Sequence, residues 1–233
     1  MINFAHRGAS EYAPENTLSS FYLGLLQGAN GIETDVQKTR DGVLVLFHDS
    51  TVDRVTDGHG NLCDFTFAEL QELKVYGNST CGFYDRILTL EEFLRRFGEY
   101  DLHFAIELKG ADVEAEALAM VKQFGLLHKT TFTSFQFAYL QKVKELDASA
   151  RIGYLTMASD ETETQRLLDI GGEEIAPMAD SVTPEKMAYW RNKGLGVRAW
   201  GVTSIELMKR MCDLGVDGMT VNFPDRLFQY RKN

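Results

Sequence analysis

Short apolar segments alternate with helix-length amphipathic segments along almost the whole chain. The strand-like segments are Ile2–Ala5, Ile32–Val36, Val43–Phe47, Leu102–Leu108, Thr130–Ser134, Arg151–Leu155, Glu174–Ala176, Gly196–Trp200 and Gly218–Val221. Helical patterns occur at Thr17–Gln27, Thr89–Phe97, Val113–Phe124, Phe135–Leu146, Glu161–Ile170, Pro184–Asn192 and Ser204–Leu214. Several of these helices end at glycine, a common C-terminal cap. Strands that alternate with helices in this way are typical of a parallel sheet.

Such a sheet either closes into a barrel or stays open and doubly wound. About eight strand–helix repeats within this length favour a (β/α)8 TIM barrel. No GxGxxG sequence follows the first strand, so the usual sign of a dinucleotide-binding open sheet is missing. We therefore predict an α/β protein with a single TIM-barrel domain over residues 1–233.

Residues 49–87 interrupt the alternation. This stretch is rich in Asp, Gly, Thr and Asn and contains one helix-like piece around Phe67–Lys74. We interpret it as a small insertion, placed after the second strand region and folded over the mouth of the barrel. A passive excursion of the chain is equally compatible with the sequence alone.

Acidic residues outnumber basic residues by 34 to 24, which gives a net charge of −10. This balance argues against a nucleic-acid partner. It also repels anionic substrates, so a phosphate-binding site needs local positive charge from a cation, arginine or lysine.

The sequence indicates no stable insertion into a membrane. No apolar run approaches the length of a membrane-spanning helix, and the first one ends at His6, which is too short for a signal peptide. We expect a cytoplasmic protein in which Cys63, Cys81 and Cys212 are reduced. A Cys63–Cys81 disulfide stays open for an exported protein.

Two carboxylates share one face of the predicted strand Ile32–Val36. Because side chains alternate along a strand, Glu33 and Asp35 point the same way. Burial of both needs a positive partner, and a hard divalent cation with oxygen ligands meets that need. An exposed edge strand or an internal salt bridge to an arginine explains this pair equally well.

Glu107 and Lys109 repeat this spacing at the end of another apolar strand. Glu107 is a candidate third metal ligand, and Lys109 is a candidate for holding a phosphate oxygen. Taken in isolation, a plain ion pair between the two is the simpler interpretation.

Two histidines end strand-like segments. His6 and Arg7 precede Gly8, which permits a sharp turn, and His48 follows Leu44–Phe47. Histidine titrates near neutrality, and arginine binds phosphate through two N–H groups. Cleavage of a phosphodiester requires a base and an acid, and two histidines supply both.

Three further residues are candidates with a structural alternative. Asn16 is either a metal ligand or, like its neighbour Thr17, an N-cap of the first helix. Glu15 either orients His6 or joins the metal site. Trp200 either forms a wall for the substrate or fills the top of the barrel.

Four segments together resemble the glycerophosphodiester phosphodiesterase family, in its bacterial cytoplasmic form: HRGASEYAPENT, IETDVQKTRDGVLVLFHD, IELKG and VRAWGVT. The resemblance covers nearly the whole chain and implies a TIM-type barrel with a small insertion after the second strand. It implies hydrolysis of glycerophosphodiesters to sn-glycerol 3-phosphate and an alcohol. The chain departs from the family at its last strand, which reads Gly218–Asp225, and at Arg86–Leu88, where a usual proline is absent.

The resemblance also assigns roles. It implies acid/base catalysis by His6 and His48, binding of Mg²⁺ or Ca²⁺ by Glu33, Asp35 and Glu107, phosphate binding by Arg7 and Lys109, a glycerol contact by Trp200, and places near the site for Glu15 and Asn16. The implied mechanism uses a hydroxyl of the substrate's glycerol as nucleophile and opens the resulting cyclic phosphate with water. We favour His6 as the first base.

Two other functions stay open. One is a related phospholipase-type phosphodiesterase that acts on lysophospholipids, and the other is a catalytically silent barrel. The chain has lost none of the histidines or carboxylates that the family uses, which disfavours the silent barrel. The expected partner is a small-molecule glycerophosphodiester, and a homodimer stays open.

Overall fold

The computed structural model describes residues 1–77, 82–157 and 160–232. Within these residues, the following strands form a parallel barrel: β1 (Ile2–His6), β2 (Gly31–Lys38), β6 (His103–Leu108), β7 (Thr130–Ser134), β8 (Arg151–Thr156), β9 (Glu174–Pro177), β10 (Gly196–Val202) and β11 (Gly218–Val221). Each strand pairs with the next in this order, and β11 pairs with β1. The sheet is therefore closed, which confirms the predicted (β/α)8 barrel and excludes the open sheet.

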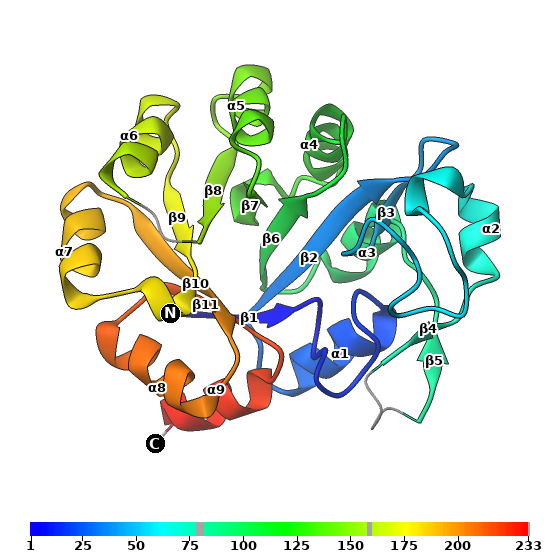
Figure 1. Ribbon diagram of the computed structural model, residues 1–233, viewed down its shortest axis with the longest axis horizontal. Helices are drawn as coiled ribbons and strands as arrows, with labels where there is room; N and C mark the ends of the chain where they lie inside the picture. The colour runs from blue at the N-terminus through cyan, green and yellow to red at the C-terminus, as the bar shows by residue number, and fades with distance from the viewer. Residues whose placement is uncertain (78–81, 158–159, 233) are drawn as a thin grey trace.

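The helices surround the barrel (Figure 1). They are α1 (Leu18–Leu26), α3 (Leu90–Phe97), α4 (Glu114–Gln123), α5 (Phe137–Leu146), α6 (Glu161–Asp169), α7 (Pro184–Asn192), α8 (Ile205–Leu214) and α9 (Pro224–Lys232), with short 3-10 turns η2 (Leu127–Lys129) and η3 (Ala179–Ser181). The sequence did not predict α9, which contacts β1 and accepts a hydrogen bond from the Asn3 amide at the Pro224 carbonyl. In the part of the chain that the structure describes, no helix is long and apolar enough to cross a membrane.

Helix α3 shows how sequence produces these elements. Thr89 and Glu92 form a capping box that satisfies the first N–H groups of the helix. The apolar side chains recur at the spacing of one helical face and are all buried: Leu90, Phe93, Leu94 and Phe97. The Phe93 ring lies 4.9 Å from the Phe21 ring and 5.4 Å from the Phe104 ring, so this face joins α1 and β6. Each fully buried phenylalanine contributes about 2–3 kcal/mol of burial free energy.

The segment Val43–Phe47 is not a strand of the barrel. It contains β3 (Leu44–Leu46), which pairs antiparallel with the end of β2, Leu46 opposite Val36. The chain thus turns back along β2, and the Phe47 amide donates to the carbonyl of Asp35. His48 reaches the end of the barrel by this return and not by the forward course of a barrel strand.

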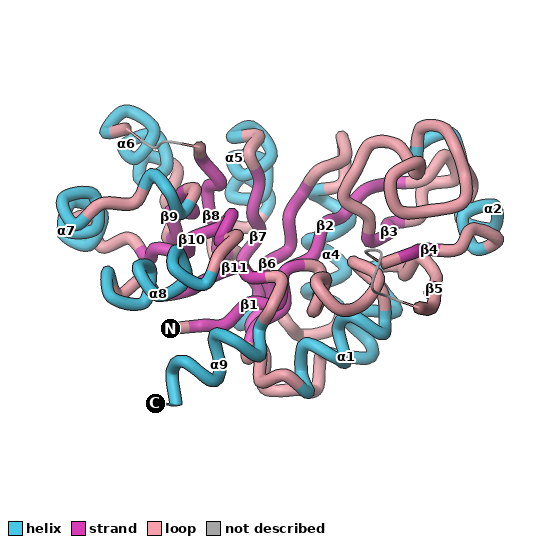
Figure 2. Tube along the Cα trace, turned by 60° about the horizontal axis from the view of Figure 1, so that its bottom comes forward, coloured by secondary structure: helices cyan, strands magenta, loops and turns pink. Residues whose placement is uncertain are grey.

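The chain between β3 and α3 lies on one side of the barrel (Figures 1 and 2). It contains η1 (Leu62–Asp64), α2 (Phe67–Gln71), β4 (Val75–Tyr76) and β5 (Tyr84–Asp85). A second apolar cluster, separate from the main core, consists of Val45, Phe47, Val52, Leu62, Leu70, Val75 and Ile87. We propose that residues 49–87 form an insertion subdomain around this cluster. Cys81 lies outside the described residues, and Cys63 and Cys212 are free thiols.

Gly8 makes the turn at the end of β1 possible. Its φ is +83°, and a Cβ there would lie 2.4 Å from the backbone carbon of Ser20. We expect Gly8→Ala to lower the free energy of unfolding by about 3 kcal/mol, because strain and overlap add. Gly42→Ala is the matched control, since Gly42 has a φ of +85° with nothing near its Cβ position. Equal urea midpoints for the two variants would contradict the role of the close contact.

Candidate active site

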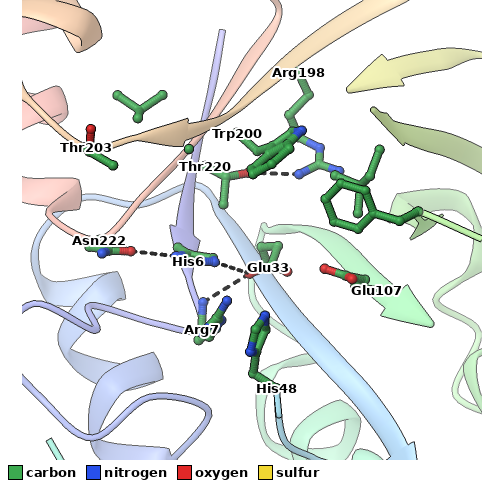
Figure 3. A pocket seen from close by; sticks show the side chains of 14 residues that line it. His6, Arg7, Glu33, His48, Glu107, Arg198, Trp200, Thr203, Thr220 and Asn222 are labelled. Carbon is green, nitrogen blue, oxygen red and sulfur yellow. Dashed lines mark hydrogen bonds and ion pairs between the residues drawn. The ribbon is translucent and has the colours of Figure 1, made fainter. Parts of the chain in front are cut away.

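One cavity of about 190 Å³ brings several predicted residues together (Figure 3). It lies where the barrel strands end, the usual place for the active site in this fold. Its lining consists of His6, Arg7, Glu33, His48, Glu107, Phe135, Leu155, Arg198, Trp200, Gly201, Val202, Thr203, Thr220 and Asn222. Of the other predicted residues, Asp35, Lys109, Glu15 and Asn16 do not line the cavity and are placed by their contacts below.

Glu33, Asp35 and Glu107 form a buried acidic triad. One carboxylate oxygen of each lies within 4.8 Å of the other two. Strand register produces this grouping, because Asp35 of β2 lies opposite Glu107 of β6. The three side chains therefore converge and do not face a solvent-exposed edge.

Asp35 is the charged centre of the triad. Burial acts to raise its pKa, but Arg7, His48 and Lys109 outweigh burial and lower it. The Arg7 Nε lies 3.2 Å from one Asp35 oxygen, and the Lys109 Nζ lies 3.7 Å from the other. Lys109 also contacts Glu107 within the triad, whereas Arg7 is shared with Glu15 outside it.

Their surroundings favour the neutral forms of the other two acids. Burial, followed by the charge of Asp35, raises the pKa of Glu33 well above its ordinary value. The same two causes raise the pKa of Glu107 to about 7. Asp35 Oδ1 is buried and has no hydrogen-bond partner. A hard divalent cation fits this set, because it needs several oxygen ligands and stabilises their ionised forms.

His6 lies beside the triad in a neutral state. Although 30% of its side chain is exposed, burial of the ring and the charge of Arg7 lower the pKa of His6 to about 4. Its Nδ1 lies 2.5 Å from the Asn222 side-chain oxygen, which only accepts hydrogen bonds. The ring proton is therefore on Nδ1, and the lone pair is on Nε2, which lies 3.9 Å from Glu33.

His48 has an anionic partner. Its Nδ1 lies 2.5 Å from an Asp49 oxygen. Burial and the charge of Arg7 lower the pKa of His48 overall, and Asp35 and Asp49 offset only part of this. Burial acts to raise the pKa of Asp49, but hydrogen bonds from Arg54 and His48 lower it to about 2. The Asp49 carboxylate thus stays charged and stabilises an imidazolium at His48.

The residues that open the first helix support Arg7 and Asp35. Glu15 accepts a hydrogen bond from Arg7. The prediction that Glu15 orients His6 therefore differs from the structure. Asn16 has a φ of +57° and donates to Asp35 at 2.9 Å. The N-cap is Thr17, not Asn16.

Trp200 forms the wall opposite the histidines. The strand is irregular here: the pairing of β10 with β11 shifts register, and Gly201 has a φ of +70°. The indole N–H donates to the Thr156 carbonyl at 3.2 Å, and the ring meets Phe135 edge to face at 5.1 Å. The indole therefore lines the cavity with a fixed orientation.

Arg198 lies at the inner end of the cavity and is almost fully buried. Its Nε donates to Glu174 and its Nη1 to the Thr220 hydroxyl, both at 2.8 Å. The sequence did not point to this residue as part of a site, nor to Asn222, Asp49, Phe135 or Thr220. Asp49 could have been predicted, because it directly follows His48 in the sequence. The other residues could not, because their places in the site depend on how the barrel strands pair.

A closed parallel barrel with an acidic triad and two imidazoles where its strands end holds the groups that metal-assisted cleavage of a phosphate ester requires. The profile of the glycerophosphoryl diester phosphodiesterase family matches residues 6–226, and the chain belongs to this family of phosphoric diester hydrolases. A glycerophosphodiester phosphodiesterase of Caldanaerobacter subterraneus is 33% identical over 231 residues, which cover 96% of this chain and 94% of that protein. Another from Bacillus subtilis is 31% identical over 258 residues, covering 100% of this chain and 87% of that protein.

Solved structures agree in fold. A phosphodiesterase of Oleispira antarctica in complex with the product sn-glycerol-3-phosphate is 27% identical, with a TM-score of 0.87 over 99% of this chain and 96% of that chain. A glycerophosphodiester phosphodiesterase of Agrobacterium tumefaciens is 26% identical, with a TM-score of 0.83 over 96% of this chain and 97% of that chain.

Proposed function

We propose that the protein hydrolyses glycerophosphodiesters to sn-glycerol 3-phosphate and an alcohol, with a divalent cation and with His6 and His48 as general acid and base. The observation that carries this proposal is one cavity lined by both imidazoles, Arg7 and two carboxylates of the acidic triad, with the third, Asp35, grouped with them. The relative from Oleispira antarctica, solved with sn-glycerol-3-phosphate, supports this product.

Glu33, Asp35 and Glu107 would hold the cation, Mg²⁺ or Ca²⁺. Bound there, the cation would supply Lewis-acid stabilisation of the negative charge that develops on the phosphate. Arg7 and Lys109 add positive charge at the same end of the barrel and bind the remaining phosphate oxygens. This local charge offsets the repulsion that the protein's net charge of −10 exerts on an anionic substrate.

The two histidines have different partners, and this difference assigns their roles. His6 Nε2 carries a lone pair, and the neutral amide of Asn222 gives little stabilisation to an imidazolium. His6 therefore removes the proton from the glycerol 2-hydroxyl as its oxygen attacks phosphorus. His48, whose imidazolium is stabilised by Asp49, gives its proton to the departing alcohol oxygen as the P–O bond breaks.

The second half of the reaction reverses these roles. His48, now neutral, removes a proton from water as the water attacks the cyclic phosphate. His6, now protonated, returns its proton to the glycerol 2-oxygen. The products are sn-glycerol 3-phosphate and the alcohol, and both histidines regain their starting states. Trp200 would contact the apolar face of the glycerol.

The test measures release of sn-glycerol 3-phosphate from glycerophosphocholine and glycerophosphoethanolamine, and release of choline from lysophosphatidylcholine, which a phosphodiesterase cleaves to choline and lysophosphatidic acid. We expect turnover of the first two diesters, loss with EDTA, and recovery with Mg²⁺ or Ca²⁺. Turnover of lysophosphatidylcholine alone would favour the phospholipase-type function. No turnover of any diester with either cation would indicate a silent barrel.

A further inference from the structure

Arg54 lies in the segment after β3 and joins two carboxylates. Its Nη1 and Nη2 donate to the two oxygens of Glu15 at 2.9 and 2.7 Å. Its Nε and Nη2 donate to the two oxygens of Asp49 at 2.5 and 3.2 Å. One guanidinium therefore makes two forked contacts, which fix the carboxylates in angle as well as in distance.

Each of these carboxylates also contacts a different residue that lines the cavity. Asp49 contacts His48 Nδ1 at 2.5 Å, and Glu15 accepts from Arg7 Nη1 at 3.0 Å. Arg54 is thus the common neighbour of the His48–Asp49 pair and the Arg7–Glu15 pair. These two pairs come from different segments of the chain, one from the chain after β3 and one from the turn after β1.

Without Arg54 the two carboxylates would face each other with no cation between them. Repulsion would separate Glu15 from Asp49, and each would pull its cationic partner with it. Half of the Arg54 side chain is exposed, so its net effect on stability is small. Solvent exposure does not reduce its effect on the relative positions of Arg7 and His48, because that effect depends on hydrogen-bond geometry.

We propose that Arg54 is a positioning residue, which sets the distance and angle between the acid/base group His48 and the phosphate-binding group Arg7. This inference rests on the roles proposed above for His48 and Arg7. It gives residues 49–87 a part in the reaction, because the insertion supplies the group that aligns the two.

The experiment compares Arg54→Gln and Arg54→Lys with Arg40→Gln, using glycerophosphocholine and saturating Mg²⁺. Arg40 is the matched control, because it is 56% exposed and lies away from the cavity. It precedes the insertion and contacts two of its residues, the Glu69 side chain and the Asp64 carbonyl. We expect Arg54→Gln to lower kcat/KM about 100-fold, as misplacement by about 1 Å does. Arg54→Lys should recover only part of this loss, because an ammonium group cannot reproduce two forks. Arg40→Gln should stay within about twofold.

Two readouts separate positioning from a structural effect. Misplacement of His48 lowers kcat and misplacement of Arg7 raises KM, so both constants should change in Arg54→Gln. A smaller folded fraction lowers kcat alone. Wild-type kinetics in Arg54→Gln, a change in kcat alone that matches a loss of folded protein by circular dichroism, or full recovery in Arg54→Lys would each overturn the inference. Full activity in His48→Ala would instead overturn the proposed function.

Discussion

The His48→Ala variant is expected to lose about 10³-fold in the rate of alcohol release from glycerophosphocholine, within the range for loss of a general acid. The loss should shrink to about tenfold or less when the departing alcohol is p-nitrophenol. Since p-nitrophenolate leaves without a proton, the acid becomes dispensable for that substrate. His6→Ala should lose about 10³-fold on both substrates, because the attacking hydroxyl still needs a base. The measurement is the rate of alcohol release in a single turnover of glycerophosphocholine and of glycerol p-nitrophenyl phosphate, with excess enzyme and Mg²⁺, because steady-state kcat also includes the later step in which His48 is the base.

His59→Ala provides the control for this pair. His59 is 85% exposed and contacts Asp53 in the insertion, outside the cavity, so its removal should leave both rates unchanged. Equal losses of His48→Ala on the two leaving groups would show that His48 is not the acid. A selective rescue of His6→Ala would show that the two roles are exchanged.

In the metal-free protein, the contribution of Glu107 to stability is expected to be lost as pH rises from about 4.5 through 7, whereas the lowered pKa of His6 acts in the opposite direction over the same range. Burial and the charge of Asp35 raise the pKa of Glu107 from its ordinary value of 4.5 to about 7. The folded state therefore binds a proton that the unfolded state has released. This stabilisation is complete below pH 4.5 and lost once pH passes 7, with a magnitude of about 3 kcal/mol. The raised pKa of Glu33 acts in the same direction.

A divalent cation should reverse this loss. At a concentration of about 1,000 times Kd it stabilises the folded state by about 4 kcal/mol, which corresponds to a rise in Tm of about 10 °C. The measurement is Tm from pH 4.5 to 8 with EDTA, Mg²⁺ or Ca²⁺. Between pH 4.5 and 7, Glu107→Gln should lose less stability, or gain more, than the native chain, and its cation response should be largely absent. Identical metal-free profiles of the two chains, or no rise in Tm with either cation in the native chain, would contradict the assignment of the triad.

The repeating core of the fold was predictable because it is local. Each barrel strand and most helices carry their own period and caps, so their ranges follow from neighbouring residues. Helix α9 was missed, and its stability comes in part from β1 through Asn3, a contact that no local pattern contains. Strand β3 looked like a barrel strand, since an antiparallel hairpin and a parallel strand present the same short apolar run.

The predictable part of the site consists of residues two positions apart on one strand, whose side chains point to the same face. Glu33, Asp35, Glu107 and Lys109 belong to this group, and their convergence follows from the barrel alone. The partners that tune them were not predictable in this way. Asn222 joins His6 across the closure of β11 on β1, and Arg54 reaches Glu15 across 39 positions of sequence. Such contacts depend on three-dimensional register and not on periodicity.

The separate apolar cluster under residues 49–87 should allow this segment to unfold locally. A segment that buries its own small core can detach without unfolding the barrel, at a lower free energy than global unfolding. Backbone amides of Leu70 and Leu62 should then exchange with deuterated water sooner than those of Phe104 and Phe132 in the closed sheet. Because Arg54 bonds this segment to Glu15 of the barrel, its removal should hasten exchange in the segment and leave the sheet unaffected.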